Sequence, residues 1–140
     1  MGTRSRIGIQ LSDDSILSVY HHWDGYPSWL GRILTTHYNS HEQAAELIDG
    51  GDMSCAWTDD CFRKSDGRME KKAQYGPQYY SERGENCPPR LDNNSEEFFS
   101  DGEEYSYIFR DGAWMCYDMN QFDVEKSVEL IEIPSGALAV

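Results

Sequence analysis

The sequence lacks long apolar segments. No apolar run approaches the roughly 20 residues that a helix needs to cross a bilayer, and residues 1–11 hold no continuous apolar region of the kind a signal peptide requires. We therefore expect a protein that stays in the cytosol where it is made and that has no membrane partner.

Basic residues are scarce. The 140 residues include 12 Lys and Arg against 25 Asp and Glu, a formal net charge of −13. Residues 1–39 are balanced, with three Arg and three Asp, whereas the chain from Pro77 onward has four basic residues and fourteen acidic ones. Because each phosphate contact normally depends on a Lys or Arg, this composition disfavours direct binding to nucleic acid.

Only four cysteines are present, and their pattern favours neither disulfides nor zinc. In a reducing compartment we expect free thiols. Cys55 and Cys61 are separated by five residues, which is wider than the two to four of a zinc knuckle, and no second pair follows. His37 and His41 are four apart, but Asn39 and Ser40 break the helix that would have to carry both. We expect no metal and no cofactor.

The length fits one domain over residues 1–140. Residues 6–11 and 16–23 alternate apolar and polar side chains around a polar turn, which predicts a β-hairpin. Pro27 and the apolar stripe that follows predict a first helix. Ser40 and Gln43 form a capping box that opens a second helix, which Gly50 and Gly51 end.

The Asp111-Gly112 pair predicts a second hairpin, since it supplies the positive φ angles of a type I′ turn. The register then pairs Phe109 with Trp114 and Tyr107 with Cys116. Residues 59–101 have the composition of a long irregular connection, either mobile or functional. Residues 123–133 fit a strand or a helix.

We therefore expect an α+β fold. Its antiparallel sheet would be built from two β-hairpins, with two short helices packed on one face and a long irregular acidic connection.

The densest chemical segment is His21 followed by His22-Trp23-Asp24-Gly25-Tyr26-Pro27. His21 and His22 point to opposite faces of a strand, so a shared metal is not expected. His22 and Asp24 would share a face, and a carboxylate can fix an imidazole tautomer for acid-base catalysis. The alternative is structural: Asp24 caps the turn, Gly25 takes an unusual backbone angle, Trp23 and Tyr26 pack, and Pro27 starts the helix.

A second candidate region combines carboxylates with aromatic rings. Its usual role would be solvated surface. Its functional interpretation is an electrostatic face for a basic partner, on which carboxylates could imitate nucleic-acid phosphates. The partner-binding residues of this hypothesis are Glu96, Glu97, Phe98, Phe99, Asp101, Glu103, Glu104 and Tyr105.

The turn resembles a group of small uncharacterised proteins, many encoded by tailed bacteriophages. The likeness covers the start Met1-Gly2-Thr3-Arg4-Ser5, the His22–Pro27 turn, the segment Leu47–Ser54 and the stretch Tyr107–Trp114. It implies a phage accessory gene and carries no established activity.

The leading hypothesis is a non-enzymatic phage protein in the cytoplasm of the infected bacterial host. It would bind and modulate or inhibit a host protein with a basic surface, in host takeover or in anti-defence. The alternative is a small hydrolase or nucleotide-processing enzyme that uses His22 and Asp24. A third possibility is sequestration of a small signalling ligand, although no Gly-rich phosphate loop is present. The oligomeric state cannot be read from these patterns.

Overall fold

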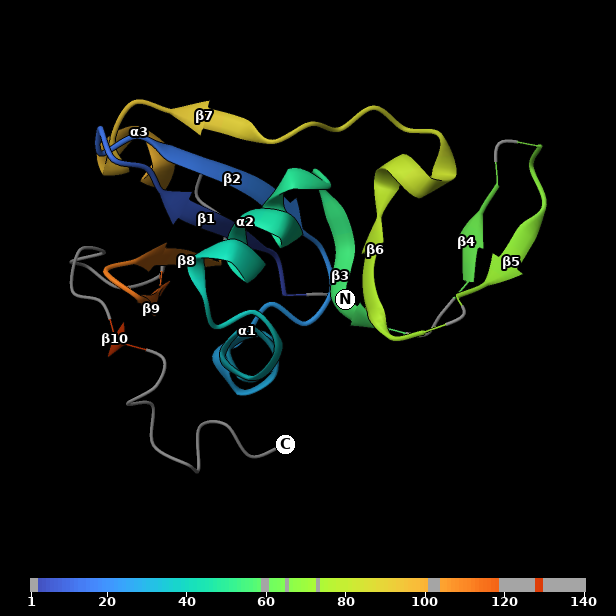
Figure 1. Cartoon of the computed structure of the whole chain (residues 1–140), viewed down its shortest axis with the longest axis horizontal. Helices are drawn as coiled ribbons and strands as arrows, with labels where there is room; N and C mark the ends of the chain where they lie inside the picture. The colour runs from blue at the N-terminus through green and yellow to red at the C-terminus, as the bar shows by residue number, and fades with distance from the viewer. Residues whose placement is uncertain are drawn as a thin grey trace.

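The computed structural model describes residues 3–58, 61–64, 66–72, 74–100, 104–118 and 128–129. Its main sheet contains eight strands in the order β10-β9-β8-β1-β2-β3-β6, with β7 also paired to β2 (Figure 1). These strands are β1 (Ser5–Gln10), β2 (Ile16–His21), β3 (Met53–Thr58), β6 (Gly76–Tyr79), β7 (Arg90–Asp92), β8 (Tyr105–Arg110), β9 (Ala113–Asp118) and β10 (Val128–Glu129). The protein is therefore α+β.

The sheet is mixed, so the expectation of a purely antiparallel sheet is wrong. β1 pairs antiparallel with β2, and β8 with β9, where Phe109 faces Trp114 and Tyr107 faces Cys116. However, β1 and β8 are parallel neighbours, as are β2 and β3. Parallel neighbours need a long crossover between them, and strand periodicity alone carries no information about which crossover the chain takes.

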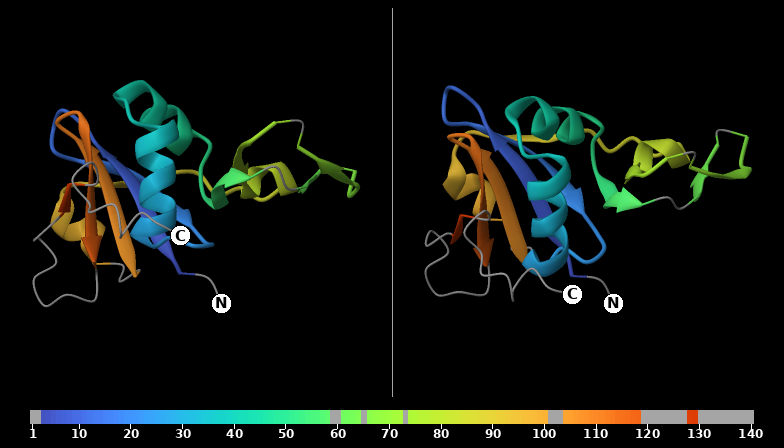
Figure 2. Two further views of the ribbon diagram at one scale, coloured as in Figure 1. Left: turned by 90° about the horizontal axis from the view of Figure 1, so that it is seen from below. Right: turned by 60° about the horizontal axis from the view of Figure 1, so that its bottom comes forward.

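Two helical segments cover one face of the sheet, as Figure 2 shows. The first joins η1 (Pro27–Gly31), a π-helical turn, to α1 (Arg32–His37), and the second is α2 (His41–Asp49), whose N-cap Ser40 accepts a hydrogen bond from the Gln43 amide. The core between the helices and the sheet includes Leu30, Leu34, Ala44, Leu47, Ile48, Ile7, Ile9, Val19, Tyr107, Phe109 and Trp114.

A third helix, which the sequence did not predict, covers the opposite face. It is α3 (Ser95–Phe99), and its Phe98 is buried against Ile16, Ile108 and Tyr117. The chain makes room for this ring at Gly8, where a Cβ atom would lie 3.4 Å from Phe98 and 2.8 Å from Ile16. Because successive side chains of a strand point to opposite faces, the sheet contributes to two separate hydrophobic cores, one on each face.

Residues 59–101 are more regular in their described part than their composition suggested. Besides β6, β7 and α3 they contain β4 (Cys61–Arg63), β5 (Met69–Lys71) and the 3₁₀ turn η2 (Tyr80–Arg83). β4 and β5 form a separate two-stranded sheet, the β4–β5 arm, at the right of Figure 1. Strands of three residues are too short to show an alternation, so sequence patterning could not reveal them.

The expected strand or helix over 123–133 lies outside the described residues except at 128–129, which pair with β9. In the described part of the chain, no helix has the length and apolar character needed to cross a membrane.

Gly25 is the tightest point between the turn and the sheet. A Cβ atom there would lie 2.5 Å from the Ser5 hydroxyl and 2.7 Å from the Thr3 carbonyl oxygen. Both neighbours belong to the chain that enters the central strand β1, so relief would require backbone movement.

We predict that Gly25→Ala lowers the free energy of unfolding by about 1–3 kcal/mol, because the added methyl overpacks a closed site. Urea or thermal denaturation measures this. Gly76→Ala is the matched control, since its Cβ would meet nothing within 4 Å, and a change within about 0.5 kcal/mol is expected. Equal effects of the two substitutions would contradict the steric argument.

Candidate functional site

The turn after β2 is held by backbone hydrogen bonds on two sides. The amides of His22 and Trp23 donate to the carbonyls of Met53 (3.2 Å) and Ser54 (2.9 Å), which belong to β3. The Gly25 amide donates to Thr3 O (2.7 Å), and the buried Tyr107 hydroxyl donates to Gly25 O (2.6 Å). The turn is therefore fixed to both the central strands and β3.

His21 is a core residue. It is fully buried, and its Nε2 accepts a hydrogen bond from the Ala56 amide (3.1 Å). Burial in the core, helped by the charge of neighbouring His22, lowers the pKa of His21 from 6.5 to about 3. Its Nδ1 has no hydrogen-bond partner. The imidazole is neutral at physiological pH and holds β2 to β3.

The structure does not bring His22 and Asp24 together as the catalytic hypothesis required. His22 Nδ1 is 2.6 Å from the Tyr20 hydroxyl, and its ring packs edge-on against Trp23, with centroids 4.6 Å apart. Asp24 is exposed and has no hydrogen bond or ion pair within the described residues. The reason is its backbone: Asp24 has a φ of 55°, which ends the strand alternation that predicted a shared face.

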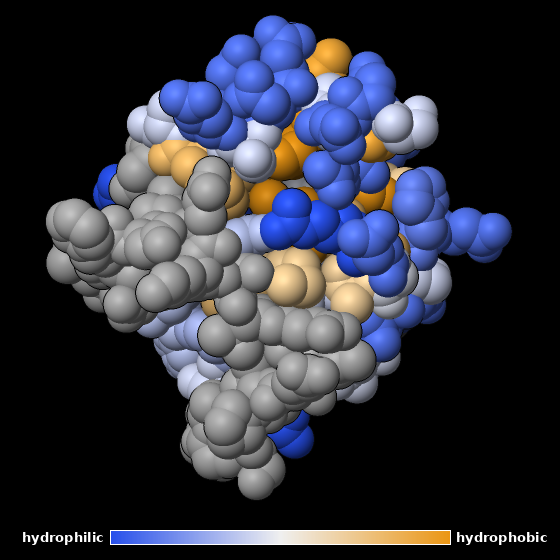
Figure 3. Space-filling view, turned by 90° about the vertical axis from the view of Figure 1, so that its left-hand side faces the viewer, coloured by the Kyte–Doolittle hydropathy of each residue, from blue (hydrophilic) through white to orange (hydrophobic). Residues whose placement is uncertain are grey.

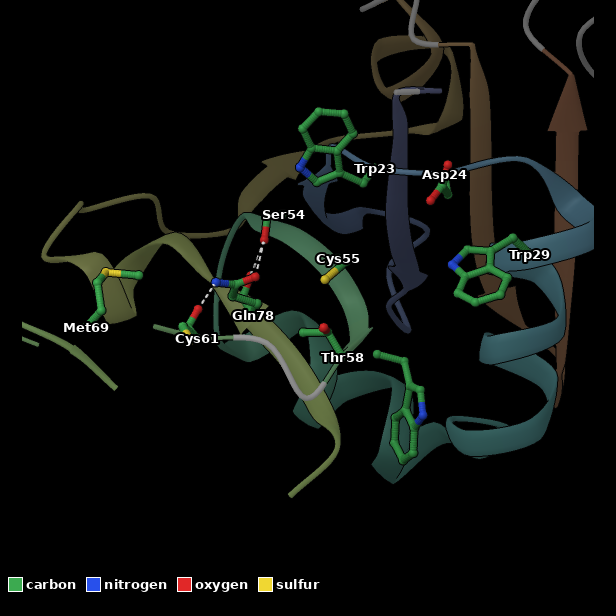
Figure 4. Close-up of a pocket in the computed structure, with 10 residues that line it drawn as sticks. Trp23, Asp24, Trp29, Ser54, Cys55, Thr58, Cys61, Met69 and Gln78 are labelled. Carbon is green, nitrogen blue, oxygen red and sulfur yellow. Dashed lines mark hydrogen bonds between the residues drawn. The ribbon is translucent and has the colours of Figure 1, made fainter. Parts of the chain in front are cut away.

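Asp24 instead lies at a cavity of about 550 Å³, which we call the tryptophan cavity (Figure 4). Trp23, Asp24 and Trp29 come from the turn and η1, while Cys61 and Met69 come from the β4–β5 arm. The remaining lining residues, from β3 and β6, are Ser54, Cys55, Trp57, Thr58 and Gln78. The cavity thus lies between the main sheet and the arm.

Two of its three indoles have substantial exposure. Trp23 is 46% exposed and Trp29 37% exposed. Trp29 follows Pro27 in η1 and precedes the buried Leu30, so it lies on the outward side of that helical segment. An exposed pair of large apolar rings beside a cavity is typical of a binding site rather than of a folding core.

The third indole belongs to a stack that closes one wall. Trp57 lies parallel to His37 at a centroid distance of 3.7 Å and parallel to Tyr75 at 5.9 Å. The pairing of β3 with β6 shifts register between Cys55 and Thr58. Such an irregularity redirects side chains, which explains how the neighbours Trp57 and Thr58 both line the cavity.

The polar groups on the cavity floor are largely satisfied by one another. The Ser54 hydroxyl donates to Gln78, and the Gln78 side-chain amide donates to the Cys61 carbonyl (Figure 4). Among the described residues that line the cavity there is no Lys, Arg or His, and Asp24 provides the one carboxylate.

The sequence singled out Trp23 and Asp24 but missed Trp29 and Trp57. These residues are far apart along the chain, and an isolated Trp usually indicates core packing, so no sequence signal joined them.

The structural interpretation of the turn holds for Pro27, which starts η1. It is wrong for Gly25, which is buried but has no positive φ, because Asp24 takes that angle instead. It is also wrong for Asp24, which does not cap η1, and for Trp23, which is exposed rather than packed in the core. Tyr26 is half-buried and accepts hydrogen bonds from the amides of Trp29 and Leu30 through its carbonyl.

The predicted acidic and aromatic face is divided by the fold. Phe98 is buried and Phe99 packs half-buried against Tyr117, while Tyr105 packs with the core on the opposite face of the sheet. The carboxylate of Glu104 accepts a hydrogen bond from the Arg4 amide (2.8 Å). Phe98 is therefore unavailable as a surface anchor, and the half-buried Tyr105 lies on the other face of the sheet. Asp101 and Glu103 lie outside the described residues.

Glu96 and Glu97 are exposed, but their neighbours on the surface differ from the residues that the sequence grouped with them. Parallel pairing of β1 with β8 brings the 11–15 turn and the 110–113 turn to the same end of the sheet, and Asp92 of β7 pairs with Ile16 just before α3. The exposed carboxylates of this acidic end are Asp13, Asp14, Glu96, Glu97 and Asp111. Figure 3 shows it as hydrophilic surface around smaller apolar areas.

No group of three or more His, Cys, Asp or Glu side chains within the described residues is placed to hold a metal ion. The chain matches no protein-family model, no curated protein and no solved structure.

We predict that stability falls as the pH drops from about 6.5 toward 3 because of His21. The folded state keeps this imidazole neutral until about pH 3, whereas the unfolded chain binds a proton near 6.5. Within that window the loss is about 1.4 kcal/mol for each pH unit.

Urea denaturation at several pH values would measure the slope for wild type and for His21→Gln. The variant should have a shallower slope, because its side chain does not titrate. Identical slopes for the two proteins would contradict a neutral buried imidazole.

Proposed function

We propose that this protein is a non-catalytic binding protein that docks on a host protein with a basic surface through its acidic end. The observation that carries this proposal is the convergence of exposed carboxylates from three segments far apart in sequence, 11–15, 93–97 and 110–113. These three described segments contain one basic residue, Arg110, whose guanidinium lies over the Tyr117 ring.

The charge of the molecule is segregated between its ends. The β4–β5 arm and its flanks, residues 61–72, hold five of the 12 basic residues against two acidic ones, Asp66 and Glu70, which pair with Arg68 and Lys64 respectively. The arm lies at the opposite end of Figure 1 from the acidic end. Such a distribution orients an approaching basic surface toward the carboxylates and accelerates the encounter.

The acidic end also offers apolar contact area. Leu11, in the turn after β1, is 36% exposed, and Leu91, in β7, is 59% exposed. Interfaces combine desolvated apolar contacts with a polar rim, so these leucines would replace Phe98 and Tyr105 as apolar anchors in the hypothesis.

Two further considerations support a binding role. The catalytic alternative needed His22 and Asp24 in contact, and they have separate surroundings. The resemblance to small phage proteins is compatible with an accessory protein that inhibits or redirects a host factor in the cytoplasm of the infected cell.

The triple variant Asp14→Asn, Glu96→Gln, Asp111→Asn tests this proposal. Asn tolerates the positive φ angles of Asp14 and Asp111, 70° and 53°, so the variant should fold. We expect pull-downs from host lysate to retain a partner at low salt with wild type and to lose it at high salt. Since exposed ion pairs contribute about 0.2–1 kcal/mol each, the variant should bind the purified partner about tenfold more weakly.

The matched control is Glu42→Gln, Glu46→Gln, Glu85→Gln, which removes the same charge from exposed positions outside the acidic end. It should bind like wild type. Equal weakening by both triple variants would show that only net charge matters, and the absence of any salt-sensitive partner would refute the proposal.

A further inference from the structure

The tryptophan cavity lies outside the acidic end and has no part in the proposed docking. It combines the exposed indoles of Trp23 and Trp29 with a carboxylate, Asp24, that has no partner within the described residues. Trp23 is oriented by its edge-on contact with His22, which in turn is hydrogen-bonded to Tyr20. These contacts fix the position of Trp23 at the cavity, so the lining can be used to infer the chemistry of a ligand.

The charge of the lining selects a cation. In the described part of the lining, the carboxylate of Asp24 is the one charged group, and the whole chain has a net charge of −13. The negative faces of indole rings attract cations, and Trp is the strongest aromatic partner for them. An anionic ligand would find no basic side chain among the described lining residues.

The hydrogen bonds of the lining select the kind of cation. A Lys ammonium has three N–H donors and an Arg guanidinium has five, all of which need acceptors when buried. Among the described lining residues, the Ser54 hydroxyl, the Gln78 amide and the Cys61 carbonyl already bond to one another. The Asp24 carboxylate would therefore be the side-chain acceptor that all of these N–H groups share. A cation without N–H donors would leave no donor unsatisfied and would place its methyl groups on the indoles.

We propose that the tryptophan cavity binds a trimethylammonium group, with its charge beside Asp24 and its methyl groups against Trp23 and Trp29. The volume of about 550 Å³ exceeds that of the group itself, so the cavity also has space for atoms bonded to the group. This site shares no described residue with the acidic end, so the cavity proposal can be refuted without affecting the docking proposal, and the reverse also holds.

The experiment titrates the full chain with choline and follows tryptophan fluorescence and the indole N–H resonances. The neutral isostere 3,3-dimethyl-1-butanol, which has the same shape without the charge, is the matched ligand. We expect choline to shift the indole resonances of Trp23 and Trp29 and to bind at least about tenfold more tightly than the isostere. Equal binding of the two ligands would overturn the proposal.

Asp24→Asn removes the charge and keeps a residue that tolerates the φ of 55°, so folding should be retained, as circular dichroism would verify. It should weaken choline binding about tenfold and leave the isostere unaffected. Trp29→Leu should weaken both ligands. Glu96→Gln, which removes an equal charge at the acidic end, should change neither, and an equal effect of Glu96→Gln and Asp24→Asn would also overturn the proposal.

Two sources could supply this group, and two further titrations separate them. Tighter binding of phosphocholine than of choline would identify a choline headgroup, and tighter binding of a peptide with trimethyl-lysine would identify a methylated protein. Both results require the trimethylammonium group. A peptide with unmodified lysine that binds as well as the trimethylated one would contradict the selection against N–H donors.

Discussion

The attachment of one turn to the central strands is the constraint on which the rest of this structure depends. Gly25 fits against Ser5 and Thr3 with no space for a side chain, while its amide and carbonyl bond to Thr3 and to the Tyr107 hydroxyl. Tyr107 lies in β8, the parallel neighbour of β1. The same contacts therefore set the end of β2, the start of η1 and the position of the turn above the sheet.

The candidate site follows from that attachment. Because Gly25 is fixed, Asp24 is held at a positive φ, and its side chain lines the cavity. Backbone conformations of this kind cost energy and persist where surrounding contacts impose them. His22 helps to position Trp23, since its ring is hydrogen-bonded to Tyr20 and packs edge-on against the indole. The turn serves as a scaffold for the cavity wall.

The distribution of charge gives the molecule two distinct ends. Carboxylates gather where the turns after β1 and β8 meet α3, whereas basic residues concentrate on the β4–β5 arm. The net charge of the chain gave no information about where the acidic and the basic residues gather. The acidic end and the tryptophan cavity share no described residue, so the docking and the ligand binding that we propose would be separate events.

Local sequence patterns determined the elements whose signals are local. The capping box at Ser40, the Asp111-Gly112 turn and the alternation of Ile7 with Ile9 each depend on neighbours a few residues away, and the corresponding helix, turn and buried face are present. The α+β class followed from them. Phe98 shows the limit of local patterns. The sequence identifies it as aromatic, but its burial against Gly8 depends on a contact between residues far apart in the chain.

Only the tertiary structure decided the parallel pairing, the acidic end and the tryptophan cavity. Each joins residues separated by tens of positions, as with Trp29 and Trp57 or Asp13 and Asp111. Long-range contacts depend on how crossovers close and on which faces bury together, and the energies that decide this are summed over the whole core. A periodicity of two or 3.6 residues cannot carry that information, so the chemistry of the turn could be read from the sequence while its partners could not.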